Sequence, residues 1–391
     1  MIEIRPLDPG DVDVAWRQNR TAFGGSGSGQ WFRTRAELGL FLAAYDGAKL
    51  VGVTGLHPYR QWYAGRDLPI TGLASVTVAP HARGRGVARA MLTASLEKMA
   101  LDGAAVSVLY PSTPPVYRAV GWEIAGVLAS AELPTNALAQ VRPVSALPGA
   151  ERSEPVTLRP VEKSDLDAVH ALYTVAARRA VGPLTRTGPL FDVTRILELD
   201  GVLLAERGGE PAGYVSYSRG GGTGLTVHDL VGGDPQVLAA LLRAVGSWQT
   251  VAPTVAIRAM DPALLPLVSP FKPPVSWEDL WMVRLIDVQK AVIGRGWPAG
   301  VQLGADLELI DPDAPWHAGS WRLEIADGSG TLERGGTGAV RIHVRGLSAL
   351  FTGFASTTAL RAAGLLDGEP AAAARLDTAF AGQMPWMVDS F

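Results

Sequence analysis

The stretch Ser75-Val-Thr-Val-Ala-Pro-His-Ala-Arg-Gly-Arg-Gly-Val-Ala-Arg89 decides how the first third of the chain folds. Its β-branched residues 76–78 predict a strand, which Pro80 ends because proline cannot donate to a strand ladder. After the glycines, the apolar residues recur on one helical stripe: Val87, Ala88, Met91, Leu92, Leu96 and Met99. We therefore expect a helix that begins near Gly86.

The start of this helix has the chemistry of an anion site. A helix amino end offers unpaired N–H groups and a positive dipole end, and the flanking arginines add charge, so a pyrophosphate would fit. Glycine lets phosphates approach the backbone donors closely. The stretch lacks the Gly-Lys-Ser/Thr of a nucleotide triphosphate loop, and Arg89 stands where a dinucleotide fingerprint needs its third glycine. The plain alternative is a basic surface turn.

Residues 83–88 have the pattern Arg-x-x-Gly-x-Ala directly after a strand. This arrangement resembles the acetyl-coenzyme A loop of the GNAT family of N-acetyltransferases. The resemblance implies acetyl-CoA as co-substrate, with no metal. The residues expected to bind the coenzyme are Val76, Thr77, Val78, Arg83, Gly84, Arg85, Gly86, Val87, Ala88, Arg89, Ser112 and Thr113.

Composition limits the other possibilities. The 391 residues are 47% hydrophobic and 19% charged, as expected for a folded protein of two or three domains, and the net charge of −3 gives no reason to expect nucleic acid. With no cysteine there is no thiolate nucleophile and no disulfide. The six histidines form no His-x-x-x-His pair, so a catalytic metal is not expected.

The amino end, Met1-Ile-Glu-Ile-Arg-Pro, has no secretory pattern, and no run of eighteen apolar residues follows anywhere. We expect a cytoplasmic protein without a membrane partner.

Two segments of the chain are alike. Residues 2–14 and 156–168 each contain an alternating strand, an Arg-Pro pair and an acidic start to a helix. The fold is therefore expected twice. The second copy has no arginine in its turn at 226–236, where Asp229 and Asp234 would repel a pyrophosphate. We interpret it as a degenerate scaffold without coenzyme, the alternative being a second active site.

Proline-rich residues 142–149 and the Trp297-Pro-Ala-Gly300 segment mark boundaries between modules. Beyond the second boundary, residues 320–326 and 339–344 alternate with period two before a helix-rich tail. The expected fold class is α+β, with a catalytic GNAT domain at 1–148, a degenerate GNAT-like domain at 149–290 and a sterol-carrier-like domain at 291–391.

The segment after the next strand, residues 105–110, carries the expected proton donor. Pro-Ser-Thr-Pro-Pro is followed by a short helix at 116–120 that contains Tyr117. In GNAT enzymes this strand splays from the donor strand, and a tyrosine one turn into the next helix faces the sulfur of the coenzyme. By that resemblance Tyr117 is the general acid, and a phenol with a pKa near 10 can protonate a departing thiolate. The alternative is a tyrosine that only fills the core.

The three-module layout, with terminal Phe391, resembles the enhanced-intracellular-survival (Eis) acetyltransferases over essentially the whole chain. In that family the terminal carboxylate serves as base, which implies this role for the α-carboxylate of Phe391. The implied mechanism is direct transfer in a ternary complex, with backbone N–H groups near residues 76–78 polarising the carbonyl. The resemblance also implies a homo-oligomer, a hexamer built from trimers.

The expected acceptor is a primary amine of a small molecule or polyamine, with aminoglycosides suggested by the family. The chain departs from the acidic cleft of that family, because residues 23–31 contain no carboxylate and Ser390 stands at the penultimate position. Phe23, Trp31 and Asp389 are the candidate acceptor-binding residues. The alternatives are a protein of this fold that binds acetyl-CoA without turnover, or a lipid carrier.

Overall fold

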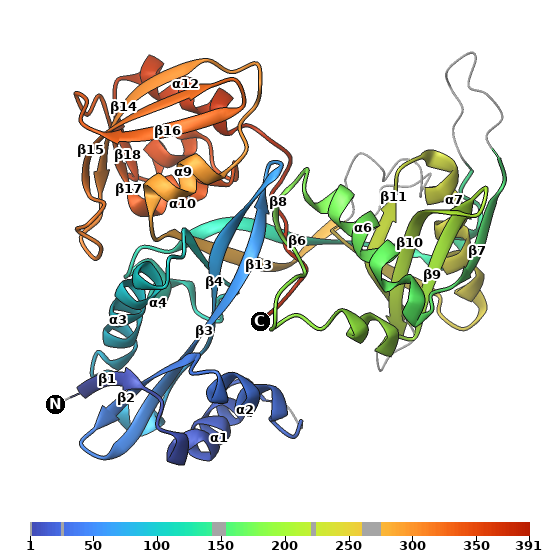
Figure 1. Cartoon of the computed structure of the whole chain (residues 1–391), viewed down its shortest axis with the longest axis horizontal. Helices are drawn as coiled ribbons and strands as arrows, with labels where there is room; N and C mark the ends of the chain where they lie inside the picture. The colour runs from blue at the N-terminus through green and yellow to red at the C-terminus, as the bar shows by residue number, and fades with distance from the viewer. Residues whose placement is uncertain (1, 25–26, 143–153, 220–223, 260–274) are drawn as a thin grey trace. The chain divides into compact units, whose positions relative to one another are not determined.

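The computed structural model describes residues 2–24, 27–142, 154–219, 224–259 and 275–391 (Figure 1). Contacts divide the chain into two compact units. The first consists of residues 1–126, 280–385 and 389–391, and the second of residues 127–279 and 386–388. Within the described ranges, every helix is too short or too polar to span a bilayer.

The first unit contains a mixed sheet with helices on both faces. In spatial order its strands are β1 (Ile2–Pro6), β2 (Phe41–Asp46), β3 (Lys49–Tyr63), β4 (Arg66–Val78), β5 (Val106–Leu109) and β13 (Val275–Leu285). Its helices are α1 (Val12–Phe23), α2 (Gln30–Glu37), α3 (Val87–Leu101) and α4 (Pro114–Arg118), with short 3-10 helices at Pro9–Asp11 and Pro80–Ala82. Neighbouring strands are antiparallel except β4 and β5, which are parallel.

Alternation along β3 assigns the helices to the two faces of this sheet. Val53 packs against Trp16 of α1 and Phe32 of α2. Leu56 points to the other face and packs against Leu92 and other residues of α3. Because successive side chains of a strand point in opposite directions, α1 and α2 cover one face and α3 the other. The helix expected near Gly86 begins at Val87.

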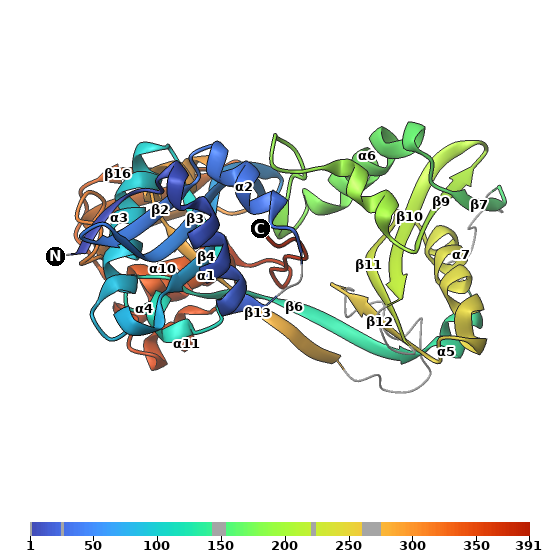
Figure 2. The same cartoon turned by 90° about the horizontal axis from the view of Figure 1, so that it is seen from below.

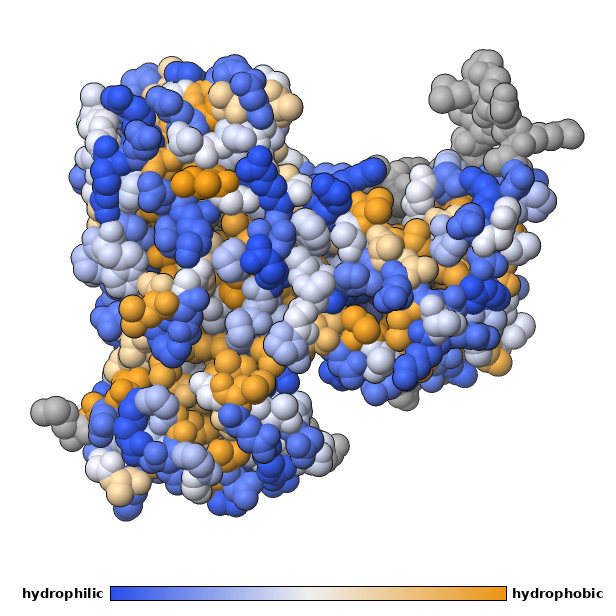
Figure 3. Space-filling model, viewed as in Figure 1, coloured by the Kyte–Doolittle hydropathy of each residue, from blue (hydrophilic) through white to orange (hydrophobic). Residues whose placement is uncertain are grey.

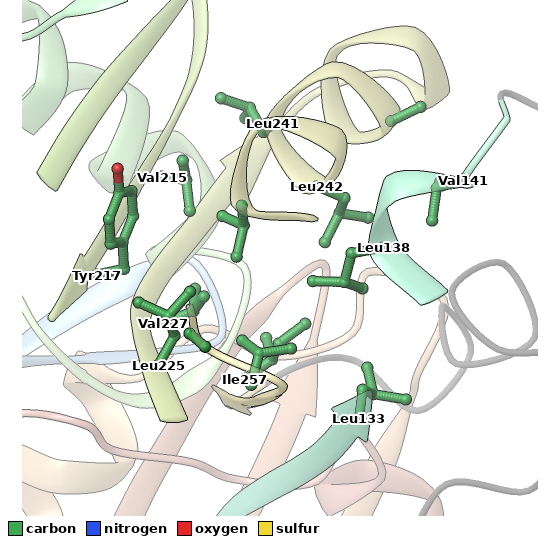
Figure 4. Close-up of a cluster of buried hydrophobic side chains, with 14 of the residues drawn as sticks. Leu133, Leu138, Val141, Val215, Tyr217, Leu225, Val227, Leu241, Leu242 and Ile257 are labelled. Carbon is green, nitrogen blue, oxygen red and sulfur yellow. The ribbon is translucent and has the colours of Figure 1, made fainter. Parts of the chain in front are cut away.

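The second unit repeats this architecture. Its strands are part of β6 (Glu123–Pro134), β7 (Val156–Pro160), β8 (Val181–Leu184), β9 (Gly201–Arg207), β10 (Glu210–Arg219), β11 (Gly224–Gly232) and β12 (Thr254–Arg258). Its helices are α5 (Thr135–Ala139), α6 (Leu166–Ala177) and α7 (Pro235–Gly246), with 3-10 helices at Lys163–Asp165, Val193–Glu198 and Ser247–Thr250. Helices α6 and α7 lie on opposite faces of its sheet (Figure 2). Leu241 and Leu242 of α7 pack on Val215 and Val227 in a buried core that also includes Leu133 (Figure 4).

The order and directions of the strands confirm the predicted repeat. The series β1-β2-β3-β4-β5 and β7-β9-β10-β11-β12 each contain three antiparallel pairings followed by one parallel pairing. Strands β1 and β7 are the two segments whose sequences are alike.

The last strand of each series pairs with one further strand that follows the other copy in the sequence. Residues Met282–Leu285 of β13 pair antiparallel with β5, although they follow the second copy in sequence. Residues 130–134 of β6 pair antiparallel with β12, although they follow the first copy. The contact units therefore do not coincide with the contiguous ranges 1–148 and 149–290 expected from the sequence.

The third module belongs to the first unit. Its sheet has the order β16 (Ser329–Arg334), β15 (Gly319–Ala326), β14 (Leu303–Ile310), β17 (Val340–His343) and β18 (Leu366–Gly368). Its helices are α9 (Val288–Gly294), α10 (Val344–Phe351), α11 (Thr357–Ala362) and α12 (Pro370–Phe380). The visible face of the chain mixes hydrophilic and hydrophobic residues (Figure 3).

A buried charge network joins β13 to this module. The side chain of Arg284 is 0% exposed, donates from Nε to the Val120 carbonyl at 3.0 Å and from Nη2 to Asp311 Oδ1 at 2.9 Å. His317 Nε2 lies 2.5 Å from Asp311 Oδ2. Burial alone would raise the pKa of Asp311, but the His317 hydrogen bond and the Arg284 charge outweigh it and hold that pKa below its ordinary value.

Removing the negative charge of Asp311 should destabilise the first unit. We expect Asp311→Asn to cost about 3–5 kcal/mol in the free energy of unfolding, because Arg284 would keep its charge without a buried partner. In the wild type this stabilisation should be present at neutral pH and be lost as the pH falls below about 4, through the lowered pKa of Asp311. Urea denaturation measures both. Asp102→Asn is the control, since its pair with Lys98 is exposed and should contribute less than about 1 kcal/mol. Equal losses in the two variants would contradict this account.

Candidate functional site

The turn between β4 and α3 is built by two glycines. Gly84 and Gly86 have φ values of +74° and +76°, a region that residues with a Cβ rarely adopt. Gly86 is the N-cap of α3 and has no side chain with which to cap the helix. The first-turn N–H groups of α3 are therefore available to an external anion.

A cavity of about 440 Å³ lies around this turn. It is lined by Ala22, Phe23, Val76, Thr77, Val78, Ala82, Arg83, Gly84, Gly86, Val87, Ala88, Arg89, Ser112, Thr113, Val116 and Tyr117. The structure thus brings the end of β4, the glycine turn, the start of α3 and the residues around α4 to one cavity. Every residue expected from the sequence to bind coenzyme lines it, apart from Arg85.

Arg85 instead points to a neighbouring strand. Its Nη2 donates to Asp46 Oδ2 of β2 at 2.8 Å, and this hydrogen bond lowers the pKa of Asp46. Arg83 stays at the cavity and donates to the Val78 carbonyl at 3.3 Å. Arg89 donates to the Ala119 carbonyl and to Asp313 of the third module, both at 2.6 Å. Of the two arginines that line the cavity, Arg83 therefore bonds a neutral carbonyl, whereas Arg89 also pairs with a carboxylate.

The pairing of β4 with β5 ends early, which opens the sheet at the cavity. The last paired residues are Gly72 and Val108, while β4 continues to Val78. Ser75 has a φ of +55°, and Ser75 and Val76 together lie opposite Thr54, the geometry of a β-bulge. Asn19 of α1 donates to Ser75 Oγ at 3.1 Å and fixes the bulge. The splayed strands expected from the sequence are present.

Tyr117 lies in α4 at the wall of the cavity and is 8% exposed. Its ring meets Trp122 edge-on, with centroids 6.5 Å apart. Burial raises the pKa of Tyr117 to about 12, so the phenol holds its proton at neutral pH. A protonated hydroxyl at the cavity can act as a hydrogen-bond donor or proton source.

The ring of the terminal residue, Phe391, lies over the middle of β4. A Cβ on Gly72 would lie 2.7 Å from Phe391 Cγ, so the ring of Phe391 covers this glycine directly. The ring also packs on Tyr59 of β3, with centroids 5.6 Å apart. Gly72 is the last β4 residue paired with β5, so Phe391 sits where the two strands separate. Gly72 and Tyr59 were not predicted from the sequence, because nothing local to either residue indicates a contact with a tail more than 300 residues away.

Of the three acceptor candidates, Phe23 lines the cavity and the other two do not. Phe23 lines the cavity and is 52% exposed. Trp31 is on α2 and not among the lining residues; its ring packs on Trp16 and Phe32, with centroids 5.9 and 5.6 Å away. Asp389 precedes Phe391 by two residues and is partly exposed, and it too is not part of the cavity lining.

The corresponding helix of the second copy, α7, is capped by the side chain of its N-cap residue, Asp234. Asp234 accepts hydrogen bonds from the Gln236 and Val237 N–H groups at the start of α7, and Arg207 pairs with this carboxylate at 2.8 Å. The groups that are open at α3 are thus already bound to a carboxylate at α7. Asp229, the other acidic residue noted in this turn, forms a buried pair with Arg186.

Three segments match known protein families. Residues 3–125 and residues 182–285 each match a family described as an acetyltransferase (GNAT) domain, and residues 288–388 match a sterol carrier protein domain. This order confirms the predicted fold class of two GNAT domains followed by a sterol-carrier-like domain.

Proteins with the same organisation match over their whole length. The chain is 30% identical over 418 residues to an uncharacterized N-acetyltransferase of Streptomyces avermitilis, with 100% of this chain and 99% of that protein covered. A solved GCN5-related N-acetyltransferase from Kribbella flavida has a TM-score of 0.89 at 29% identity, covering 100% of this chain and 98% of that one. Eis1 from Mycobacterium abscessus shares the fold, with a TM-score of 0.78, 22% identity and 100% of each chain covered.

The matches fit the chemistry of the cavity. An open helix amino end, a glycine turn and a lining arginine suit the pyrophosphate of a coenzyme, and GNAT domains use acetyl-CoA as co-substrate. The full-length relative, the two GNAT domains and the sterol carrier protein domain together show that this chain is an acyltransferase of the GNAT family of N-acetyltransferases, with the three-domain fold of Eis1.

Proposed function

We propose that this enzyme transfers the acetyl group of acetyl-CoA directly to a primary amine of a small-molecule acceptor, with both substrates bound together. One observation carries the proposal: the open amino end of α3 and the protonated hydroxyl of Tyr117 belong to the same cavity of about 440 Å³. A diphosphate donor and a proton source are needed within one site for this reaction.

The coenzyme would be held mainly by backbone and by one arginine. The N–H groups after Gly86 and the guanidinium of Arg83 would bind the pyrophosphate, and the hydroxyls of Ser112 and Thr113 are placed at the cavity to help hold the rest. Arg89 would contribute less, since Asp313 already neutralises it. When bound, acetyl-CoA supplies an acyl group activated as a thioester. The backbone of residues 76–78, past the end of the β4–β5 pairing, is positioned to polarise its carbonyl.

Tyr117 would be the general acid. Attack of an amine on the thioester expels a thiolate, which must be protonated. Because burial keeps the pKa of Tyr117 near 12, the phenol is protonated at any physiological pH and ready to donate. Its buried position also limits competition by water.

The α-carboxylate of Phe391 would be the base. An amine arrives largely as an ammonium ion, so a proton must leave before attack. Residues Ala74–Val78 contain no acidic side chain, whereas the chain terminus is seated at the separation of β4 and β5. A terminal carboxylate, with an ordinary pKa near 3.5, is ionised at neutral pH and can accept a proton directly or through water.

Polyamine-type acceptors, aminoglycosides among them, are the first compounds to test.

We also propose a homo-oligomer, a hexamer, on the family resemblance. Light scattering on the purified protein would measure its molar mass. The second GNAT domain is proposed to bind no coenzyme, because Asp234 occupies the amino end of α7.

A negative charge at Gly86 should abolish the coenzyme site. Gly86→Asp is expected to weaken binding of coenzyme A at least tenfold, because a carboxylate at the helix start repels a diphosphate. Gly86→Asn is the matched control, since it has the same shape and backbone strain without the charge. Isothermal titration calorimetry with each variant gives the comparison. If the Asp and Asn variants bind coenzyme A equally, the diphosphate does not lie at this turn.

Removing the Tyr117 hydroxyl should affect turnover and not binding. We expect Tyr117→Phe to lower kcat by about a hundredfold or more, while the coenzyme affinity changes less than about threefold. Since the acid is active when protonated, the wild type should show no loss of kcat from this group below about pH 11. Tyr45→Phe is a control, because Tyr45 is buried and bonds Asp11 away from the cavity. Near wild-type turnover of Tyr117→Phe, or loss of kcat near pH 8 that this variant abolishes, would refute the assignment.

Displacing the terminal carboxylate should also lower turnover. One glycine appended after Phe391, or Gly72→Ala, which forces the Phe391 ring from its seat, is expected to reduce kcat at least tenfold with coenzyme affinity nearly intact. Gly304→Ala is the control, because a Cβ there meets no atom within 4 Å. Thiol release under saturating acetyl-CoA measures the effect. Unchanged turnover in the extended chain would exclude the carboxylate as base.

A further inference from the structure

The guanidinium of Arg35, on α2, carries a charge that no carboxylate neutralises in the described part of the chain. Its Nη2 donates to the Tyr59 hydroxyl at 3.2 Å and its Nη1 lies 3.4 Å from the Trp31 carbonyl. Its Nε is enclosed and has no hydrogen-bond partner. Both of these hydrogen-bond partners are neutral groups, and the side chain is partly buried.

The neighbouring arginine on the same helix shows the usual arrangement. Arg33 donates to Asp13 Oδ1 at 3.0 Å, so its charge is balanced by α1. Elsewhere in the first unit, Arg5 pairs with Asp8 and Arg60 with Asp67. A partly buried arginine left without such a partner costs free energy, and an anion that arrives with a ligand would remove that cost.

Arg35 lies one side chain away from the terminal residue. Its Nη2 bonds Tyr59, and the ring of Tyr59 packs on Phe391. The guanidinium also faces the ring of Trp31, with Cζ 5.4 Å from the centroid. These residues come from α2, β3 and the tail, and a chain of contacts connects them to Phe391, the proposed base.

The remaining titratable group on this face of β3 adds no negative charge. His57 is 0% exposed, and both of its ring nitrogens are without a partner. Burial, and then the charge of Arg35, lower the pKa of His57 to about 3, so the imidazole is neutral. It stands directly opposite Gly72 in the register of β3 and β4, and its ring meets Phe41 edge-on, with centroids 5.8 Å apart. The charged side chain that contacts Tyr59, next to Phe391, is therefore the cation of Arg35.

We infer that the acceptor amine also carries a carboxylate, which Arg35 binds while the amine is turned toward Phe391. This inference rests on the proposed function and narrows its acceptor to amino-acid-like amines. A guanidinium binds a carboxylate through charge-assisted hydrogen bonds, and its planar donors orient the ligand. A polycation without an acidic group would instead be repelled by Arg35.

Amine pairs that differ only in the carboxylate test the inference. Lysine with cadaverine, and ornithine with putrescine, are compared as acceptors by thiol release from acetyl-CoA. In the wild type, kcat/KM should be at least about tenfold higher for the carboxylated member of each pair. In Arg35→Gln this preference should fall below about twofold, while Arg33→Gln should retain it because Arg33 is paired with Asp13.

Two results would overturn the inference. One is an equal kcat/KM for both members of each pair in the wild type. The other is a uniform loss in Arg35→Gln over all four amines, which would assign Arg35 to the Phe391 carboxylate instead.

A calorimetric titration separates this inference from the proposed function. Lysine and cadaverine are titrated into the protein saturated with coenzyme A. Tighter binding of lysine to the wild type, lost in Arg35→Gln, supports the role of Arg35 even if no amine releases thiol, in which case the proposed function alone fails. Equal binding of the two amines overturns the role of Arg35.

Discussion

The separation of β4 from β5 after Gly72 and Val108 is the constraint on which the site depends. Beyond that pair, β4 runs on to the bulge at Ser75 and then into the glycine turn, so one strand carries the donor side of the site. The ring of Phe391 fits over Gly72 because this residue has no side chain. The carboxyl end of β4 therefore lines the cavity, and Phe391 lies where β4 and β5 separate.

Charge is arranged differently at the carboxyl end of this strand and at its middle, around Gly72. At the carboxyl end, the open start of α3 and Arg83 offer donors to a diphosphate. Near Gly72, neutral His57 and unpaired Arg35 surround the seat of the tail. In the second copy the amino end of α7 is capped by Asp234, which accepts hydrogen bonds from the Gln236 and Val237 N–H groups. The residue at the N-cap, Gly86 in α3 and Asp234 in α7, is therefore one physical difference between the two copies.

Local sequence patterns predicted the elements that carry most of the cavity lining. The strand at 76–78, the helix from Val87 and the cavity residues around Tyr117 are close in sequence, and each has a local cause in β-branching, glycine conformation or helical periodicity. Arg85 was predicted at the coenzyme and pairs with Asp46 instead. An alternating run of arginine and glycine does not specify which guanidinium turns toward the cavity, because that depends on the neighbouring strand.

The sequence by itself determined the α+β class, the repeated domain, the third module and the glycine turn before α3, because these depend on spacing within short segments. Only the tertiary structure decided that β13 completes the first sheet, that Phe391 covers Gly72 and that Arg35 reaches Tyr59. The pairings of β13 with β5 and of β6 with β12 join segments more than 100 residues apart. No local sequence pattern indicates which strand will pair with which. The surroundings of Phe391 are built from such distant contacts, whereas most of the cavity lining comes from the continuous stretch 76–89.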